Sequence, residues 1–104
     1  MQGDIWLTKV YFQNFEMFKV RPVVIVGHDL TIDIDVIISP ITSAAPRSEF
    51  DVVIEFWKES GLLYPSVART TKLASIPRKE LMRKLGKLNE QDLKNVISQC
   101  RKLF

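Results

Sequence analysis

Two short runs rich in β-branched residues place the strongest constraint on how this chain folds. They are residues 20–26 (VRPVVIV) and residues 36–43 (VIISPITS). Each predicts a strand buried on both faces, because β-branched side chains favour extended backbone and the apolar residues are nearly continuous. Arg21 stands at the start of the first run, and Thr42 and Ser43 end the second. If the strands pair antiparallel, Arg21 and Thr42 meet at one sheet edge, where a guanidinium and two hydroxyls would face one anionic group.

The rest of the pattern predicts a small, strongly curved antiparallel β-barrel that is plugged by a C-terminal helix. Further short strands are expected at residues 5–12, 50–56, 66–69, 72–76 and 82–88, with one helical turn at 77–81. Asn89 is a good N-cap, Glu90 and Asp92 follow in the first turn, and apolar residues then recur at helical spacing. With 104 residues the chain forms one domain, residues 1–104, because this length does not bury two cores.

Composition argues against several kinds of chemistry. Cys100 is the only cysteine, which excludes an internal disulfide, and its place on the predicted helix favours a buried apolar role over a reactive thiol. His28 is the only histidine, so we expect neither a metal nor another cofactor. No apolar run reaches the roughly 18 residues that span a bilayer, and the N-terminus carries no targeting segment. We therefore expect a cytoplasmic protein that does not enter membranes.

Basic and aromatic residues leave two interpretations open. The formal net charge is only +3, but seven basic residues crowd into nineteen positions: Arg69, Lys72, Arg78, Lys79, Arg83, Lys84 and Lys87. They form either a solvated surface or a surface that binds a polyanion. The loop at residues 13–20 is rich in aromatic side chains, which either pack on their own core, stack on a ligand or contact a second copy. The candidates for stacking on unpaired bases are Phe15, Phe18, Trp57 and Tyr64.

Five blocks of the sequence, in order, resemble the MazF/PemK toxin family. They are residues 3–7 (GDIWL), 21–26 (RPVVIV), 40–43 (PITS), 61–69 (GLLYPSVAR) and 85–88 (LGKL), followed by the terminal helix. The resemblance covers nearly the whole chain. It implies a ribonuclease of a toxin–antitoxin pair, which cleaves single-stranded RNA, chiefly messenger RNA, at short sequence motifs without a metal. It also implies a homodimer with an SH3-like barrel, a fold that the CcdB gyrase poisons share, and a cognate antitoxin as partner.

The resemblance also implies roles for individual residues. The family's catalytic arginine and threonine match Arg21 and Thr42, and the acidic residue that serves some members as proton acceptor matches Glu16. The expected RNA-binding residues are Ser43, Arg69, Lys19 and Lys72. Two features depart from the family. Residues 14–20 contain no glycine, and Thr71 stands where some members carry an acid.

These roles agree with the chemistry of RNA cleavage without a metal. The ribose 2'-hydroxyl attacks the adjacent phosphorus, so a base removes its proton, donors stabilise the added negative charge, and an acid protonates the leaving 5'-oxygen. His28 alone cannot be both acid and base. Arg21 is suited to stabilise the charge through paired hydrogen bonds and is a possible acid, Thr42 to anchor the phosphate, and Glu16 to act as base. On the residues alone, Arg21 could equally tie down a loop while Thr42 caps a strand.

Two other functions remain open on the same barrel. A gyrase poison is a protein-binding module that uses apolar residues of its C-terminal helix, and Phe104 ends this chain. A non-catalytic nucleic-acid-binding module would use the basic residues between 69 and 87. Strong salt dependence of RNA binding without cleavage would favour the second of these.

Overall fold

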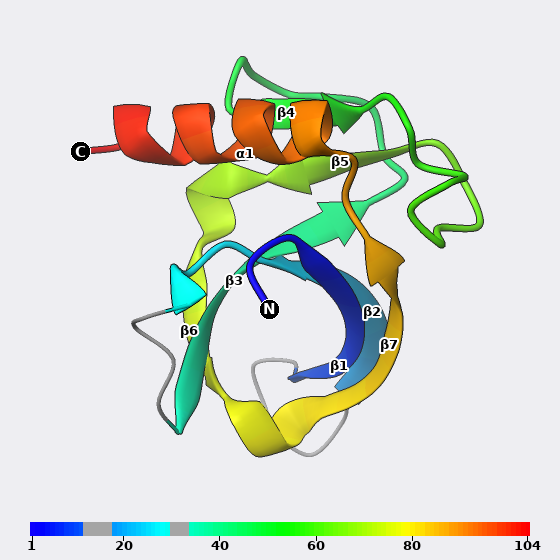
Figure 1. Ribbon diagram of the computed structural model, residues 1–104, viewed down its shortest axis with the longest axis vertical. Helices are drawn as coiled ribbons and strands as arrows, with labels where there is room; N and C mark the ends of the chain where they lie inside the picture. The colour runs from blue at the N-terminus through cyan, green and yellow to red at the C-terminus, as the bar shows by residue number, and fades with distance from the viewer. Residues whose placement is uncertain (12–17, 30–33) are drawn as a thin grey trace.

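A strongly curved antiparallel sheet rolls into a barrel, and a helix lies across one end of it in the computed structural model, which describes residues 1–11, 18–29 and 34–104 (Figure 1). The elements are β1 (Asp4–Tyr11), β2 (Phe18–Ile25), β3 (Asp35–Thr42), β4 (Asp51–Ile54), β5 (Ser66–Arg69), η2 (Thr70–Lys72), β6 (Ala74–Pro77), η3 (Arg78–Glu80), β7 (Leu81–Lys87) and α1 (Glu90–Lys102). The predicted fold, a small antiparallel barrel with a C-terminal helix, is confirmed.

Strand β3 connects the two parts of the sheet. Along one edge it pairs antiparallel with β2, from Val23–Pro40 to Ile25–Ile38. Along the other edge its first half pairs with β6 and its end pairs with β5. The η2 turn therefore interrupts one continuous path from β5 to β6, as the sequence predicted around Thr70. On the far side of β2 the sheet continues through β1 to β7, and β4 pairs with β5.

Two apolar clusters lie on opposite faces of this sheet. Val23 and Ile25 belong to the cluster inside the barrel, whereas Val24 and Val26 belong to the larger cluster that α1 covers. Successive residues of a strand point to opposite faces, so a strand between two cores must be apolar at every position. The predicted burial of β2 on both faces is thus confirmed from Val23 onward. It is wrong for Val20 and Arg21, which are exposed because β2 there extends beyond its ladder with β3.

Pro22 limits the ladder between β2 and β3. Strand β2 begins at Phe18, before the predicted run at residues 20–26, so Pro22 lies inside it. The ladder with β3 ends at the pair Val23–Pro40, next to Pro22. Pro22 has no N–H to donate toward β3, which stops the ladder at this point. Beyond it, the end of β3 pairs with β5 instead.

Strand β4 is shorter than predicted because a residue of α1 binds the backbone N–H groups of the two residues that follow it. The carboxylate of Asp92 is fully buried in the first turn of α1 and accepts the backbone N–H groups of Glu55 and Phe56 at 3.0 and 2.9 Å. The strand therefore ends at Ile54. The predicted helix start is confirmed, since the Asn89 side chain accepts the N–H of Gln91 at 2.8 Å.

Candidate functional site

The candidate catalytic residues lie where β2 and β3 separate. The ladder between these strands ends at Val23–Pro40, and two residues beyond it stand Arg21 on β2 and Thr42 on β3. Side chains two residues apart in a strand point to the same face, so Arg21 and Thr42 share the face of Val23 and Pro40. The antiparallel pairing on which the prediction of their proximity depended is confirmed.

A row of side chains continues from Thr42 across the next two strands. Thr42 is opposite Val67 in β5, and Val67 is opposite Val53 in β4. All three share one face of the sheet. The alternate residues of these strands point to the opposite face, where they are buried beneath α1. The face with Arg21 and Thr42 is therefore the one that the helix leaves uncovered.

Arg21 is exposed on β2, opposite β1. Its ladder partner in β1 is Thr8, whose side chain is buried and whose hydroxyl donates to the Glu80 carbonyl at 2.9 Å. The ion pairs among the described residues do not include Arg21. The guanidinium thus keeps its charge and its donors available for an anion from solution.

The hydroxyl of Thr42 is oriented by its own turn. Its Oγ1 atom accepts the backbone N–H of Ala44 at 3.2 Å, which leaves the hydroxyl proton to be donated elsewhere. The neighbouring Ser43 is exposed and lies at the rim of a hollow of about 370 Å³. Arg21, Thr42 and Ser43 therefore offer hydrogen-bond donors at one end of the β2–β3 pair, as a phosphate site requires.

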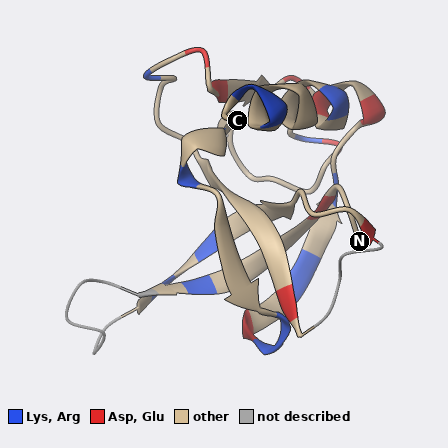
Figure 2. Ribbon diagram, turned by 90° about the vertical axis from the view of Figure 1, so that its left-hand side faces the viewer, with Lys and Arg blue, Asp and Glu red and all other residues tan. Residues whose placement is uncertain are grey.

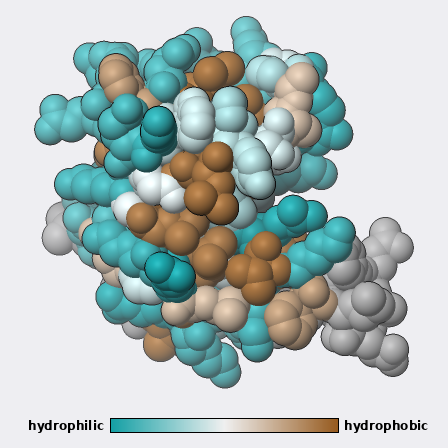
Figure 3. Space-filling model, turned by 90° about the vertical axis from the view of Figure 1, so that its right-hand side faces the viewer, coloured by the Kyte–Doolittle hydropathy of each residue, from teal (hydrophilic) through white to brown (hydrophobic). Residues whose placement is uncertain are grey.

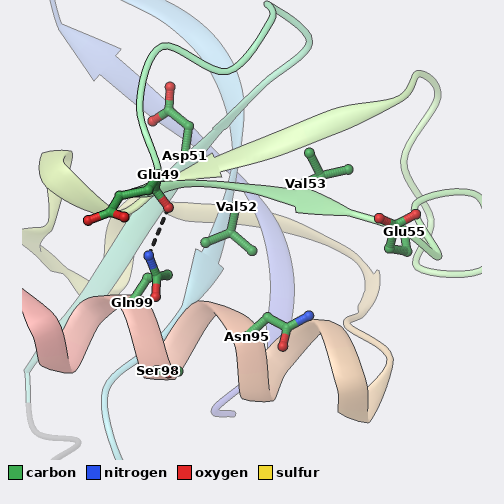
Figure 4. Close-up of a pocket in the computed structure, with 8 residues that line it drawn as sticks. All are labelled: Glu49, Asp51, Val52, Val53, Glu55, Asn95, Ser98 and Gln99. Atoms are coloured by element: carbon green, nitrogen blue, oxygen red, sulfur yellow. Dashed lines mark hydrogen bonds between the residues drawn. The ribbon is translucent and has the colours of Figure 1, made fainter.

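A second hollow, of about 360 Å³, is lined by several carboxylates. It lies between β4 and α1, and Figure 4 shows the side chains around it. Glu49, Asp51 and Glu55 line it on the strand side, while Asn95 and Gln99 line it on the helix side. The Gln99 amide donates to the Glu49 carbonyl at 2.8 Å across one end. Carboxylates repel phosphates, so this hollow is unsuited to an RNA backbone.

Arg69, an expected RNA-binding residue, lies in an ion pair within the sheet. Its Nη1 atom is 3.5 Å from Oδ2 of Asp51, its ladder partner, and the two side chains are only 13% and 3% exposed. Asp51 also accepts the backbone N–H of Arg47 at 2.9 Å. Arg69 shares a face with Val67 but is held by this carboxylate, so an RNA phosphate would have to compete with Asp51.

Replacing Arg69 with alanine is expected to destabilise the protein by roughly 3–5 kcal/mol, because the Asp51 carboxylate would stay buried without its cation. Urea denaturation would measure the change in the free energy of unfolding. The double variant Arg69→Met with Asp51→Asn should recover most of the loss, since no charge is then buried. If Arg69→Ala keeps full stability and lowers only RNA affinity, Arg69 is a phosphate-binding residue and not a structural one.

The remaining predicted residues are spread over the molecule. Lys19 is exposed two residues before Arg21, on the same face of β2. Phe18 points to the other face, where the Lys9 ammonium lies 4.8 Å from its ring centre. Lys72 is exposed in η2, which packs against α1, β3 and β4. Glu16 and Phe15 lie outside the described residues.

Three of the seven crowded basic residues contact partners within the protein. Figure 2 shows basic positions on the barrel strands and on the helix, with acidic positions among them. Lys84 pairs with Asp4 at 3.4 Å, and Arg78 donates to the sulfur of Met1 at 3.0 Å. Together with Arg69, which pairs with Asp51, these residues already have partners within the protein.

Cys100 lies on the buried face of α1, as the sequence predicted, and its burial raises the pKa of the thiol. A raised pKa keeps the thiol protonated and therefore unreactive. In residues 1–11, 18–29 and 34–104, histidine, cysteine and acidic side chains do not gather in a group of three suited to a metal ion. Within these same ranges α1 is too short and too polar to cross a membrane.

Two features of the site had not been inferred from the sequence. One is the pairing of Arg69 with Asp51, and the other is the hollow beside Ser43, whose wall includes Trp57. The alternation of Asp51, Val53 and Glu55 with buried residues was a usable signal, because it places these three on one face of β4. This alternation could not show which residues of distant loops would contact Asp51, Val53 and Glu55.

Comparisons with known proteins identify what the chain is similar to. A family model described as "PemK-like, MazF-like toxin of type II toxin-antitoxin system" matches residues 1–104. No curated protein matches the chain significantly.

Several solved structures share the fold. The Mycobacterium tuberculosis toxin MazF-mt6 is 21% identical, with a TM-score of 0.74 and 93% of each chain covered. An endoribonuclease in complex with its cognate antitoxin, from a Mycobacterial species, is 14% identical, with a TM-score of 0.80, 98% of this chain and 91% of that chain covered. A MazE–MazF structure from Deinococcus radiodurans is 18% identical, with a TM-score of 0.79 and coverages of 98% and 92%. At these identities the likeness establishes the fold.

Proposed function

Because the chain belongs to the PemK-like, MazF-like toxin family of type II toxin–antitoxin systems, we propose that it is an endoribonuclease that cleaves single-stranded RNA, chiefly messenger RNA, at short sequence motifs. The observation that carries the proposal is the position of Arg21 and Thr42 on the sheet face that α1 does not cover, where β2 and β3 separate. Solved proteins of the same fold are called endoribonucleases, which supports the proposed activity.

The proposed reaction needs no metal ion. The ribose 2'-hydroxyl attacks the adjacent phosphorus, and the bond to the 5'-oxygen of the next nucleotide breaks. The products are a 2',3'-cyclic phosphate and a 5'-hydroxyl end. Arg21 donates paired hydrogen bonds to the non-bridging oxygens, where negative charge accumulates in the transition state. Thr42 donates its hydroxyl proton to the same phosphate, because its oxygen already accepts the N–H of Ala44.

Proton transfer completes the reaction. We assign the base to Glu16, which lies five residues before Arg21 in the sequence. We assign the protonation of the leaving oxygen to Arg21. Ser43 and Lys19 are proposed to bind the RNA backbone beside Arg21, and Lys72 and Arg69 to contribute at the periphery. Arg69 does so only where RNA displaces it from Asp51.

The toxin assignment also implies partners and a compartment. We propose a homodimer that acts in the cytoplasm and is inhibited by a cognate antitoxin, whose acidic and apolar tail folds over Arg21 and the neighbouring strands. Structures of the same fold contain an antitoxin, in line with this proposal. Exposed apolar side chains favour the dimer: Figure 3 shows them gathered between the helix layer and the barrel, and Leu63 is 83% exposed. Gel filtration should give the mass of two chains.

The proposed activity is tested with a long single-stranded RNA in excess EDTA, followed by mapping of the ends by primer extension. Discrete cuts that leave 5'-hydroxyl ends are expected, with none in single-stranded DNA of the same sequence, because DNA lacks the nucleophile. Intact RNA would contradict the proposal. Salt-dependent RNA binding without cleavage would then favour a nucleic-acid-binding module, and inhibition of gyrase would favour a gyrase poison, for which the exposed Phe104 is the candidate contact.

A further inference from the structure

We propose that the hollow beside Ser43 binds an unstacked base of the RNA next to the cleaved phosphate, with Trp57 as the stacking surface and Glu55 as the group that reads the base edge. This inference rests on the proposed ribonuclease function and adds a base-binding subsite to it. The hollow is lined by Ser43, Ala44, Ala45, Pro46, Val53, Ile54, Glu55, Trp57, Pro65, Ser66 and Val67.

The hollow is continuous with the proposed phosphate site. Ser43 and Ala44 directly follow Thr42, and Val67 is the ladder partner of Thr42. Val53 continues the same row on β4. A phosphate held by Arg21 and Thr42 therefore has one neighbouring nucleotide at the mouth of this hollow. Single-stranded RNA can turn such a base out of the stack and into a pocket.

The walls suit a flat, largely apolar ring. Trp57 is half-buried and packs against the main core, so its indole is held in place before a ligand arrives. A fixed aromatic face loses little conformational entropy on stacking with a base. Pro46 and Pro65 add rigid apolar surface. The hydroxyl of Ser66 already donates to the Tyr64 carbonyl at 2.7 Å, so it is not the polar group that selects the ligand.

The charge in the hollow favours a base over a second phosphate. Among the described residues that line it, the charged one is Glu55, which is exposed just after β4 and whose backbone N–H donates to Asp92. A carboxylate repels a phosphate but accepts hydrogen bonds from an amino group on a base. Cytosine, adenine and guanine carry such a group, and uracil does not. We infer a subsite that prefers an amino-bearing base over uracil.

The first test compares cleavage by matched variants on RNAs that differ at one nucleotide beside the cut. Trp57→Ala should lower kcat/KM about 10- to 100-fold, mainly by raising KM. Trp57→Phe should keep most of the wild-type kcat/KM, because phenylalanine still stacks on a base. Glu55→Gln should fold normally and reduce the preference for an amino-bearing base over uracil by about 10-fold. Lys58 follows Trp57 in the connection after β4 but does not line the hollow, so Lys58→Ala should change neither kcat/KM nor the base preference.

A second measurement separates this inference from the proposed function. In Trp6→Phe with Arg21→Ala, Trp57 is the only tryptophan and the proposed catalytic arginine is absent, so fluorescence reports RNA at the hollow without cleavage. Oligoribonucleotides bearing cytosine should quench Trp57 more than those bearing uracil. Wild-type cleavage with unchanged rate and motif in folded Trp57→Ala and Glu55→Gln would overturn the subsite alone. If the wild type does not cleave RNA but oligoribonucleotides quench Trp57 fluorescence, the proposed enzyme activity is rejected and the base-binding subsite is retained. If an acidic, apolar peptide quenches Trp57 fluorescence and RNA does not, the hollow binds a protein partner and the subsite is rejected.

Discussion

Arg21→Ala is expected to lower kcat/KM for RNA cleavage by about 100- to 1000-fold, because a donor that stabilises the transition state is lost. The effect on folding should be small, since the guanidinium is exposed and the ion pairs of the described residues do not include it. The loss should appear in kcat as well as in kcat/KM, since the added charge on the phosphate exists only in the transition state. Initial rates on one cleavage site, with the melting temperature of each variant, measure both quantities.

Two control variants make this result specific. Arg21→Lys keeps the charge but cannot donate in a bidentate fork, so it should restore only part of the activity. Lys19→Ala removes a cation from the same face of β2 and should mainly weaken binding in a salt-dependent manner. A reduction of less than about 3-fold in folded Arg21→Ala would reject the role that we assign to Arg21 and would direct attention to another donor on this face.

Local patterns in the sequence predicted most elements of this fold, because each depends on residues that are close together in the chain. The β-branched runs gave β2 and β3, and the signals around Asn89 gave the start of α1. Errors arose where a distant group decided the outcome. Asp92 lies 37 residues from Glu55, yet its carboxylate ends β4 by binding that residue's N–H. No local propensity contains this information.

The candidate site shows the same division. Arg21 and Thr42 could be placed at one edge because both belong to strands that were expected to pair. The position of Arg69 depended on whether Asp51 would lie opposite it, which follows only from the register of β4 and β5. The hollow around Trp57 needs two connections, after β3 and after β4, to fold beside each other. Loops of this kind follow the packing of the whole chain, so their sequence alone does not place them.

The backbone of the connection after β4 lies very close to the backbone of β7 at two glycines. A Cβ atom on Gly86 in β7 would lie 2.2 Å from the carbonyl oxygen of Ser60, and a Cβ atom on Gly61 would lie 2.2 Å from the carbonyl oxygen of Leu85. Gly61 also has a φ of +91°, which disfavours any L side chain. A glycine inside a strand often marks such an approach of another backbone. Neither contact can be relieved by a side-chain rotation, because each partner is a main-chain atom.

Gly86→Ala is therefore expected to destabilise the fold by about 3 kcal/mol, through a forced displacement of either β7 or the connection. For a domain of this size that corresponds to a fall in melting temperature of about 10–20 °C. Lys87→Ala, the next residue in β7, is exposed and should stay within about 0.5 kcal/mol of wild type. Circular dichroism melts of the two variants measure the difference. Equal melting temperatures would mean that the backbones at Ser60 and Leu85 separate at little cost, and the connection that carries Trp57 would then be loosely attached to the barrel.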